Sequence, residues 1–358
     1  MPTEPPSPPP VPGLPAVLRL PPHRSVLPLG SDGRLLGLDP AVALAVDRLE
    51  PPLAAMLDEL VEPVPAAALL ERAVQRGGAR EVAEQLLREL VAAGAIVDAA
   101  LLDRRSGHRA ESTVVVSGDG PLAVGMVLGL VQAGVGAVYT ESAGTVLAGD
   151  LGTGHVDADR GHRRAAAIRA AVRRVRPDAD APPAPARLVP DLVVLADALA
   201  PEPTRLLRLH ARGGAHLLVR MRDGVGVIGP LVLPGRTACL GCLDLQRRAR
   251  APGWSTVAAY LADRRGRADP AATAATAALG VAQTLAALDS TCSGGDRPPT
   301  WEATLELDAT AGTVARRVWT PHPDCGCGAG SVRNGGTGGI PHDCVTSADT
   351  REGERIMV

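Results

Sequence analysis

The sequence contains no lysine and no phenylalanine. All 37 basic residues are arginine, and the only aromatic residues besides histidine are 3 Trp and 2 Tyr. Without lysine the chain cannot form a Schiff base, use a lysine general base or build a phosphate-binding loop that depends on lysine. With so few aromatic side chains, a platform on which nucleic-acid bases stack is not expected.

A surplus of charge of either sign is also lacking, because 37 basic and 39 acidic residues leave a net charge of −2. Such a chain has no general field that attracts nucleic acid or anionic lipid. The most apolar run, residues 121–138, contains four glycines and would make a poor membrane span. The first residues carry no export signal. We therefore expect a cytoplasmic protein with neither nucleic acid nor a membrane as partner.

The first third of the chain predicts a small winged-helix domain over residues 15–102, preceded by a disordered Pro-rich tail, residues 1–14. Two short apolar runs flank Gly30-Ser31-Asp32-Gly33 and predict a β-hairpin over residues 26–38. Asp39-Pro40 predicts the start of the first of several helices. The last helix, residues 80–93, carries leucines at helical spacing and is followed by Gly94.

A charged segment, residues 103–111, separates this domain from a second one over residues 111–328. Predicted strands and helices alternate there, which indicates a doubly wound, Rossmann-like α/β fold. The Gly-rich remainder, residues 329–358, is expected to be a loose tail.

A glycine turn opens the second domain. Gly118-Asp119-Gly120-Pro121-Leu122-Ala123 lies between a predicted strand and a predicted helix, as in nucleotide-binding folds, with Ala123 in place of the last glycine. Such turns also serve plain strand–helix packing. An adenylating site needs acidic residues for Mg²⁺ and ribose, and cations for the triphosphate. Only one acid, Glu141, follows the second strand, and the sequence therefore argues against ATP as a cofactor. Arg164 could contact phosphate or belong to a solvated helix face.

Two close pairs of cysteines give the strongest local pattern: Cys239 and Cys242, then Cys325 and Cys327. Each pair can direct two thiolates at one ion, and together they predict a closed four-sulfur site for structural zinc. Four unrelated buried cysteines, or a redox Cys-x-x-Cys pair, are the alternatives. His322 could also replace one thiolate.

No catalytic motif is found: both Gly-x-Ser-x-Gly and His-Glu-x-x-His are missing. The predicted hairpin could instead offer a sheet edge to an extended peptide, with the helix over residues 80–93 as the opposite wall. A domain that only packs against its neighbour, or that forms a homodimer, is the alternative. DNA binding is disfavoured because the charges on that helix cancel. The side chains expected at the peptide are Val26, Leu27, Leu29, Arg34, Leu36, Gln85 and Arg88.

Residues 229–245, with Pro-Gly-Arg-Thr-Ala-Cys-Leu-Gly-Cys-Leu-Asp, and residues 322–327, His-Pro-Asp-Cys-Gly-Cys, carry a resemblance to a known family. They resemble the ThiF-like cyclodehydratase-partner proteins, which bind the leader peptides of thiazole/oxazole-modified microcins, thiopeptides and related ribosomal peptides. The likeness covers about residues 15–328. It implies a PqqD-like peptide-recognition element followed by an E1/ThiF-type domain with a zinc site.

The resemblance also implies site residues. Arg164 falls where the family has a lysine near the triphosphate, and Asp197 follows a strand as the family's aspartate does. With Gly118, Gly120 and Glu141 they would form a vestigial nucleotide site, because the acidic cluster is reduced and a glycine is lost. These departures fit family members that deliver substrate while a separate YcaO protein hydrolyses ATP. We thus expect a non-catalytic recruiter with a YcaO-type cyclodehydratase as partner; the alternative is a ThiF-type adenylyltransferase that activates a carboxylate.

Overall fold

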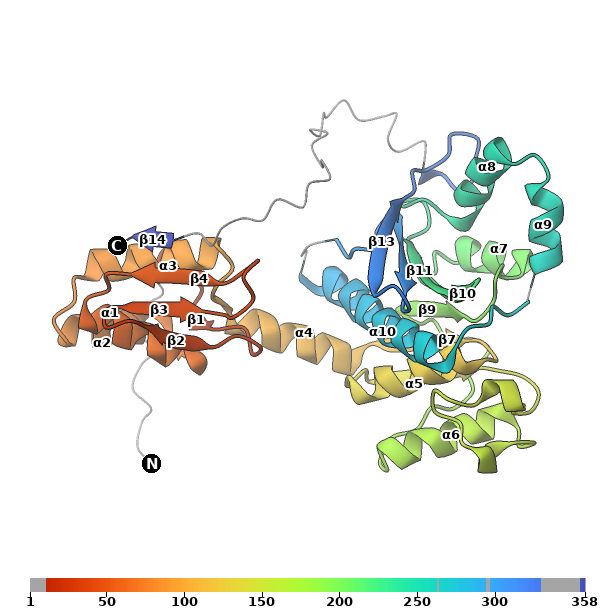
Figure 1. Ribbon diagram of the computed structural model, residues 1–358, viewed down its shortest axis with the longest axis horizontal. Helices are drawn as coiled ribbons and strands as arrows, with labels where there is room; N and C mark the ends of the chain where they lie inside the picture. Colours follow the sequence, from red (N-terminus) through yellow and green to blue (C-terminus); the bar gives the residue numbers. More distant parts are fainter. Residues whose placement is uncertain (1–10, 263, 294–296, 330–354, 358) are drawn as a thin grey trace. The chain divides into compact units, whose positions relative to one another are not determined.

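The computed structural model describes residues 11–262, 264–293, 297–329 and 355–357. The chain divides into two compact units, residues 1–104 with 340–358, and residues 105–339. Helix α4 (Ala99–Glu111) crosses this division, so the charged segment between the two predicted domains is helical (Figure 1). Most of the two predicted tails lies outside the described residues.

The first unit contains two small sheets, with strand orders β14-β4-β3-β2 and β5-β1-β6. Its strands are β1 (Val17–Arg19), β2 (Val26–Leu29), β3 (Gly33–Leu36), β4 (Leu44–Asp47), β5 (Val64–Pro65), β6 (Val97–Asp98) and β14 (Arg355–Met357). Three helices pack with them: α1 (Pro51–Asp58), α2 (Ala66–Gln75) and α3 (Arg80–Ala92). The predicted hairpin is present as β2 and β3, which pair antiparallel from Val26↔Leu36 to Leu29↔Gly33.

Strand β4 corrects the prediction of a helix that starts at Asp39-Pro40. The segment after Pro40 is a turn, and β4 pairs antiparallel with β3. Leu44 and Val46 are buried and the residues between and after them are half-buried, which is the alternation of a strand with one covered face. Pairing with β3 therefore decides the structure of a segment whose local capping pattern favoured a helix.

Strand β14 departs from the prediction of a loose tail. It pairs in parallel with β4, and Ile356 lies opposite Val46. The described part of the C-terminal region therefore extends the sheet of the first unit by one strand. The core of this unit is formed by leucines from α1, α2 and α3 that pack under the sheets.

The second unit is built on a seven-stranded sheet of order β13-β12-β11-β10-β9-β7-β8. Strands β7 to β10 run parallel, and β11 to β13 continue the sheet as an antiparallel meander. The strands are β7 (Thr113–Ser117), β8 (Ala137–Glu141), β9 (Leu192–Ala196), β10 (His216–Arg222), β11 (Val225–Val232), β12 (Ala303–Asp308) and β13 (Thr313–Val318). Every residue of β9 is buried, as expected for a strand covered on both faces.

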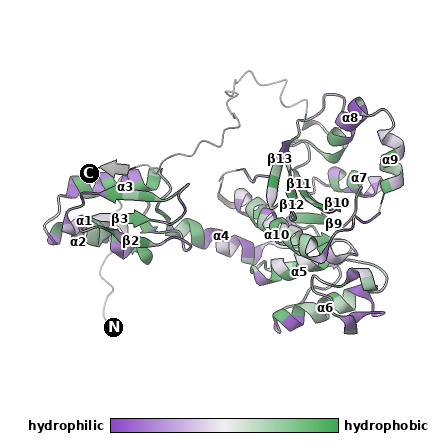
Figure 2. Ribbon diagram, viewed as in Figure 1, coloured by the Kyte–Doolittle hydropathy of each residue, from purple (hydrophilic) through white to green (hydrophobic). Residues whose placement is uncertain are grey.

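Helices cover both faces of this sheet, as in a doubly wound fold. The helices are α5 (Pro121–Gln132), α6 (Arg164–Val175), α7 (Pro203–Ala211), α8 (Leu240–Arg250), α9 (Trp254–Leu261) and α10 (Pro270–Ser293). One core joins the sheet to α5, α6 and α10, and the other joins it to α7 and α8. In Figure 2 the strands at the centre of the sheet are hydrophobic, whereas α8 is largely hydrophilic.

Two glycines let α5 and α10 pack closely. A Cβ on Gly125 would lie 2.9 Å from the Ala277 Cβ, and one on Gly129 would lie 2.7 Å from the Val281 Cγ2. Two of the four glycines in the most apolar run of the chain therefore serve helix packing. The stretch Pro270–Thr291 of α10 is long and apolar enough to cross a membrane by length and composition alone, but it packs on the sheet and on α5 as a core helix.

Candidate functional site

A pocket of about 640 Å³ lies at the carboxyl ends of β7, β8 and β9. In open α/β sheets this edge is where ligands bind. The pocket is lined by Ser117, Gly118, Asp119, Glu141, Ser142, Ala143, Leu195, Ala196, Asp197, Ala198, Pro201, Glu202, Arg205 and Arg265. The structure thus brings together three residues that the sequence analysis singled out: Gly118, Glu141 and Asp197.

Asp197 occupies the centre of the glycine turn. It is buried and has a φ of 70°, a left-handed conformation that only a few non-glycine residues adopt. Its carboxylate accepts hydrogen bonds from the amides of Gly120 at 2.9 Å, Leu122 at 3.0 Å and Ala123 at 3.2 Å. These amides lie at the N-terminus of α5, the position at which such folds bind a phosphate. In this chain a carboxylate of the protein itself takes that position.

The environment of Asp197 acts on its pKa in two opposing ways. Burial raises the pKa, and the three amide donors, above all Gly120, oppose that rise because they stabilise the charged form. A buried carboxyl group with a raised pKa in a pocket is typical of functional sites. Together with the glycine turn, this feature makes the pocket a candidate functional site.

The charges around the pocket pair with one another. Arg205 forms an ion pair with Glu141. Arg265 binds Asp150 at 3.0 Å and lies 3.8 Å from Asp119. The lining contains four acidic residues and two arginines, 2 − 4 = −2, and both arginines are engaged. As it stands, this lining disfavours a polyanion unless cations accompany it.

Arg164 lies outside the pocket lining. It is buried, donates to Asp150 at 2.8 and 3.1 Å and to the Ala143 carbonyl at 2.6 Å, and so fixes the loop that follows β8. The structure therefore gives Arg164 a structural contact, and its helix face is not solvated at this position. Sequence reasoning missed Arg205 and Arg265, because nothing in their local sequence separates them from the many other arginines.

The residues proposed to contact a peptide lie on β2, β3 and α3 of the first unit. Leu36 is completely buried and holds β3 onto the core, so its side chain is not accessible to a bound peptide. Arg34 is ion-paired with Asp58 at 2.7 Å. On α3, Gln85 donates to Glu89 at 2.7 Å and Arg88 to Glu84 at 2.9 Å. The remaining three are Val26, which packs against the core, Leu27, which is half-buried, and Leu29, which is exposed.

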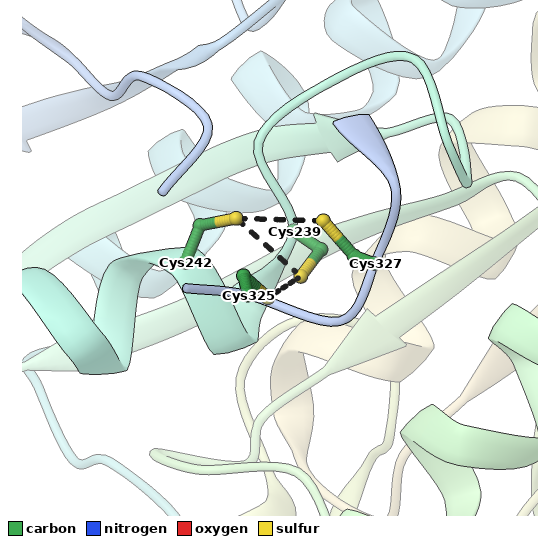
Figure 3. Close-up of side chains that lie close together, drawn as sticks. All are labelled: Cys239, Cys242, Cys325 and Cys327. Atoms are coloured by element: carbon green, nitrogen blue, oxygen red, sulfur yellow. Dashed lines mark hydrogen bonds between the residues drawn. The ribbon is translucent and has the colours of Figure 1, made fainter. Parts of the chain in front are cut away.

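The four paired cysteines converge at one point (Figure 3). Their Sγ atoms all lie within 4.8 Å of one another, and neighbouring sulfurs are 3.6, 3.6 and 3.8 Å apart. A tetrahedral ion with metal–sulfur bonds of about 2.3 Å places its sulfurs roughly 3.8 Å apart. The cluster can therefore hold a metal ion with little rearrangement, and it joins the start of α8 to the segment after β13. His322 is not part of it.

Close packing of thiols changes their acidity. A hydrogen bond from Cys239 lowers the pKa of Cys242 to about 4, and the same contact raises the pKa of Cys239. Burial raises the pKa of Cys325 to about 11. A bound cation would replace these shared protons, because thiolates are the ligands of metals. The sequence prediction that these four cysteines come together is confirmed; Cys344 lies outside the described residues.

No protein-family model and no curated protein matches this sequence. Among solved structures, E. coli MccB with ATP aligns to 87% of this chain and 99% of its own, with a TM-score of 0.67 and 13% identity. The microcin C7 biosynthetic enzyme MccB with N-formylated MccA gives 0.66 over the same shares, also at 13% identity. MccB solved without a ligand aligns to 92% of this chain and 100% of its own, at 0.65 and 13% identity.

At this level of identity the comparison establishes the fold. The chain has the mixed α/β fold of MccB over most of its length. Because a protein of this fold is solved with ATP, the sequence argument against ATP receives no support from the comparison.

Proposed function

We propose that this chain recruits the precursor of a ribosomally made peptide natural product and presents it to a partner enzyme. In this proposal the first unit is a PqqD-like winged helix that binds the leader peptide. The second unit is a degenerate E1/ThiF-type body with a structural zinc ion on its four cysteines. The partner is a YcaO-type cyclodehydratase, which would form azolines or azoles from Cys, Ser or Thr of the precursor.

The pocket of the second unit supports the proposal that this chain does not itself transfer AMP from ATP to a substrate. Asp197 occupies the anion position at the N-terminus of α5, and Arg205 and Arg265 are bound to carboxylates. A triphosphate would need those amides and cations for itself. Catalysis in the complex would then belong to the partner, and this chain would contribute effective concentration, on the order of millimolar for a tethered substrate.

The peptide edge favoured by the structure is β4. Strand β2, which the hairpin prediction pointed to, contains Pro28, and proline offers no N–H to an incoming strand. The outer edge of β4 pairs with β14 in parallel, so it accepts an added strand. We propose that the leader adds to the same sheet at β4, in the place that β14 takes here.

The test is binding of a dye-labelled leader peptide to the full chain, followed by fluorescence anisotropy. Ala45→Pro removes an N–H from β4 and should weaken binding at least tenfold, whereas Val26→Pro, which changes the outer edge of β2, should not. Both variants need an unchanged second-unit melting transition and a folded first unit, checked by circular dichroism. Binding lost only with Val26→Pro would move the site to the hairpin edge, and full binding by both variants would contradict strand addition.

A second candidate function, ATP-dependent activation of a carboxylate, is favoured by the 640 Å³ pocket and its buried Asp197. Pyrophosphate exchange separates the two. No exchange by the purified chain, with or without peptide, supports recruitment. Exchange that is lost in Asp197→Ala, at unchanged leader affinity, supports an adenylyltransferase.

A further inference from the structure

A second hollow, of about 210 Å³, lies in the second unit between the sheet and α8 and α9. It shares no lining residue with the 640 Å³ pocket. Four elements contribute to it: β10, α8, α9 and the end of β13. The lining residues are Arg222, Arg247, Arg250, Ala251, Trp254, Arg317 and Trp319.

The hollow has an excess of positive charge. Four arginines line it, and two carboxylates pair with them, which leaves 4 − 2 = +2. Glu306 alone serves both Arg222 at 2.9 Å and Arg317 at 3.0 Å. Arg250 is exposed and has no ion-pair partner in the described chain. This excess is unusual in a chain whose net charge is −2.

A fifth arginine, on the same strand as Arg222, is affected by the same charges. Arg220 is buried and donates to the Leu199 carbonyl at 2.8 Å. Burial, with further contributions from Arg247 and Arg222, lowers the pKa of Arg220 to about 9. The charges that face it from α8 and the sheet are Arg247, Arg222, Asp244 and Glu306. An anion in the hollow would relieve this repulsion.

Two of the three tryptophans of the chain fix the geometry of the hollow. The guanidinium of Arg247 lies 5.0 Å from the ring centroid of Trp254 and 5.4 Å from that of Trp319. Each indole N–H has its own acceptor at 3.1 Å, Asp244 for Trp254 and Thr304 for Trp319. The rings are therefore held in place, and Arg247 is preorganised between them.

We propose that this hollow binds one carboxylate side chain of an acidic peptide segment. Guanidinium groups bind carboxylates in a planar, two-bond geometry. Asp244 and Glu306 already show that carboxylates fit these arginines. The hollow has room for one side chain rather than a nucleotide. Strand β13, which ends beside it, is exposed along its whole length and pairs only with β12 in the described part of the chain, so its edge can bind an extended backbone.

The experiment uses the full chain and a synthetic peptide in which glutamate alternates with threonine, and follows tryptophan fluorescence and calorimetry. The peptide should bind, and its glutamine counterpart should bind at least tenfold more weakly. Arg250→Gln should weaken binding about tenfold, and raised salt should weaken it further. The matched control is Arg248→Gln, on the same helix and exposed but outside the lining, which should change binding little.

Several results would overturn the proposal. Equal binding of the glutamine peptide, or equal loss in the two arginine variants, would show that the hollow does not recognise carboxylates. Full displacement of the peptide by inorganic phosphate at low concentration would point to a free anion as the ligand. Tighter binding of a single-stranded oligonucleotide would replace the peptide with nucleic acid. None of these results bears on leader binding by the first unit, so the two proposals fail independently.

Discussion

The four-cysteine cluster allows a quantitative prediction about stability. Cys239 and Cys325 are 86 residues apart in the sequence, and an ion bound by both sulfurs would link these two segments. Closing a loop of this length restricts the unfolded chain by about 5 kcal/mol at 25 °C. We therefore expect Cys325→Ser to lower the unfolding free energy of the second unit by about 5 kcal/mol, which for a unit of this size lowers its melting temperature by roughly 10–20 °C.

Calorimetry and metal analysis test this prediction together. The wild-type chain should carry about one zinc per chain, and Cys325→Ser should carry much less. A strong chelator should lower the melting temperature of the wild-type chain by a similar amount and that of the variant very little. Cys292→Ser, which leaves all four cysteines of the cluster unchanged, is the control. An unchanged zinc content in Cys325→Ser, or a chelator without effect on the wild-type chain, would refute a structural zinc ion.

Three further predictions concern the two units. Burial lowers the pKa of His216 from 6.5 to about 4, so between these pH values the unfolded state binds a proton that the folded state does not. The unfolding free energy therefore falls by about 3 kcal/mol as the pH drops from 6.5 to 4. His216→Asn, which keeps a donor for the Gly214 carbonyl, should reduce this pH dependence in urea titrations. Gly226→Ala would place a Cβ 2.0 Å from the buried Thr276 Oγ1 and should lower the unfolding free energy in denaturant titrations by about 1–3 kcal/mol. An unchanged unfolding free energy would mean that α10 can shift away from the new methyl group. Leu18 is fully buried, and Leu18→Ala should lower the unfolding free energy of the first unit by about 3–5 kcal/mol without moving the melting temperature of the second unit. A shift of both melting temperatures would show that the units unfold together.

The parts of the fold that were predictable are those in which local sequence and tertiary structure agree. The start of the second unit is an example, because a β-branched strand, a glycine turn and Pro121 at the first helical position predict the β7–α5 connection without ambiguity. The cysteine cluster was predictable for a different reason. Thiolate chemistry favours one shared site for two close pairs of cysteines in one chain, and the structure decides against four separate cysteines and against His322 as a member of the cluster.

The parts that were not predictable depend on contacts between distant segments. Strand β4 forms because β3 pairs with it, although Asp39-Pro40 locally favours a helix. Asp197 was placed near the glycine turn by resemblance, but its three bonds to the turn depend on a left-handed φ that the sequence does not show. The arginine and tryptophan hollow combines residues from β10, α8, α9 and β13, and no periodicity connects them.

If the leader adds to β4 as proposed, β14 competes with it, because β14 already pairs with that edge. Because this strand is covalently attached, its local concentration is on the order of millimolar and does not fall on dilution. A free peptide with micromolar affinity would have to displace β14. A longer peptide that also contacts α3 or a partner enzyme would bind more tightly and displace β14 more readily. Only ligands that bind tightly enough to displace β14 would then occupy the edge of β4, and weakly binding extended chains would not.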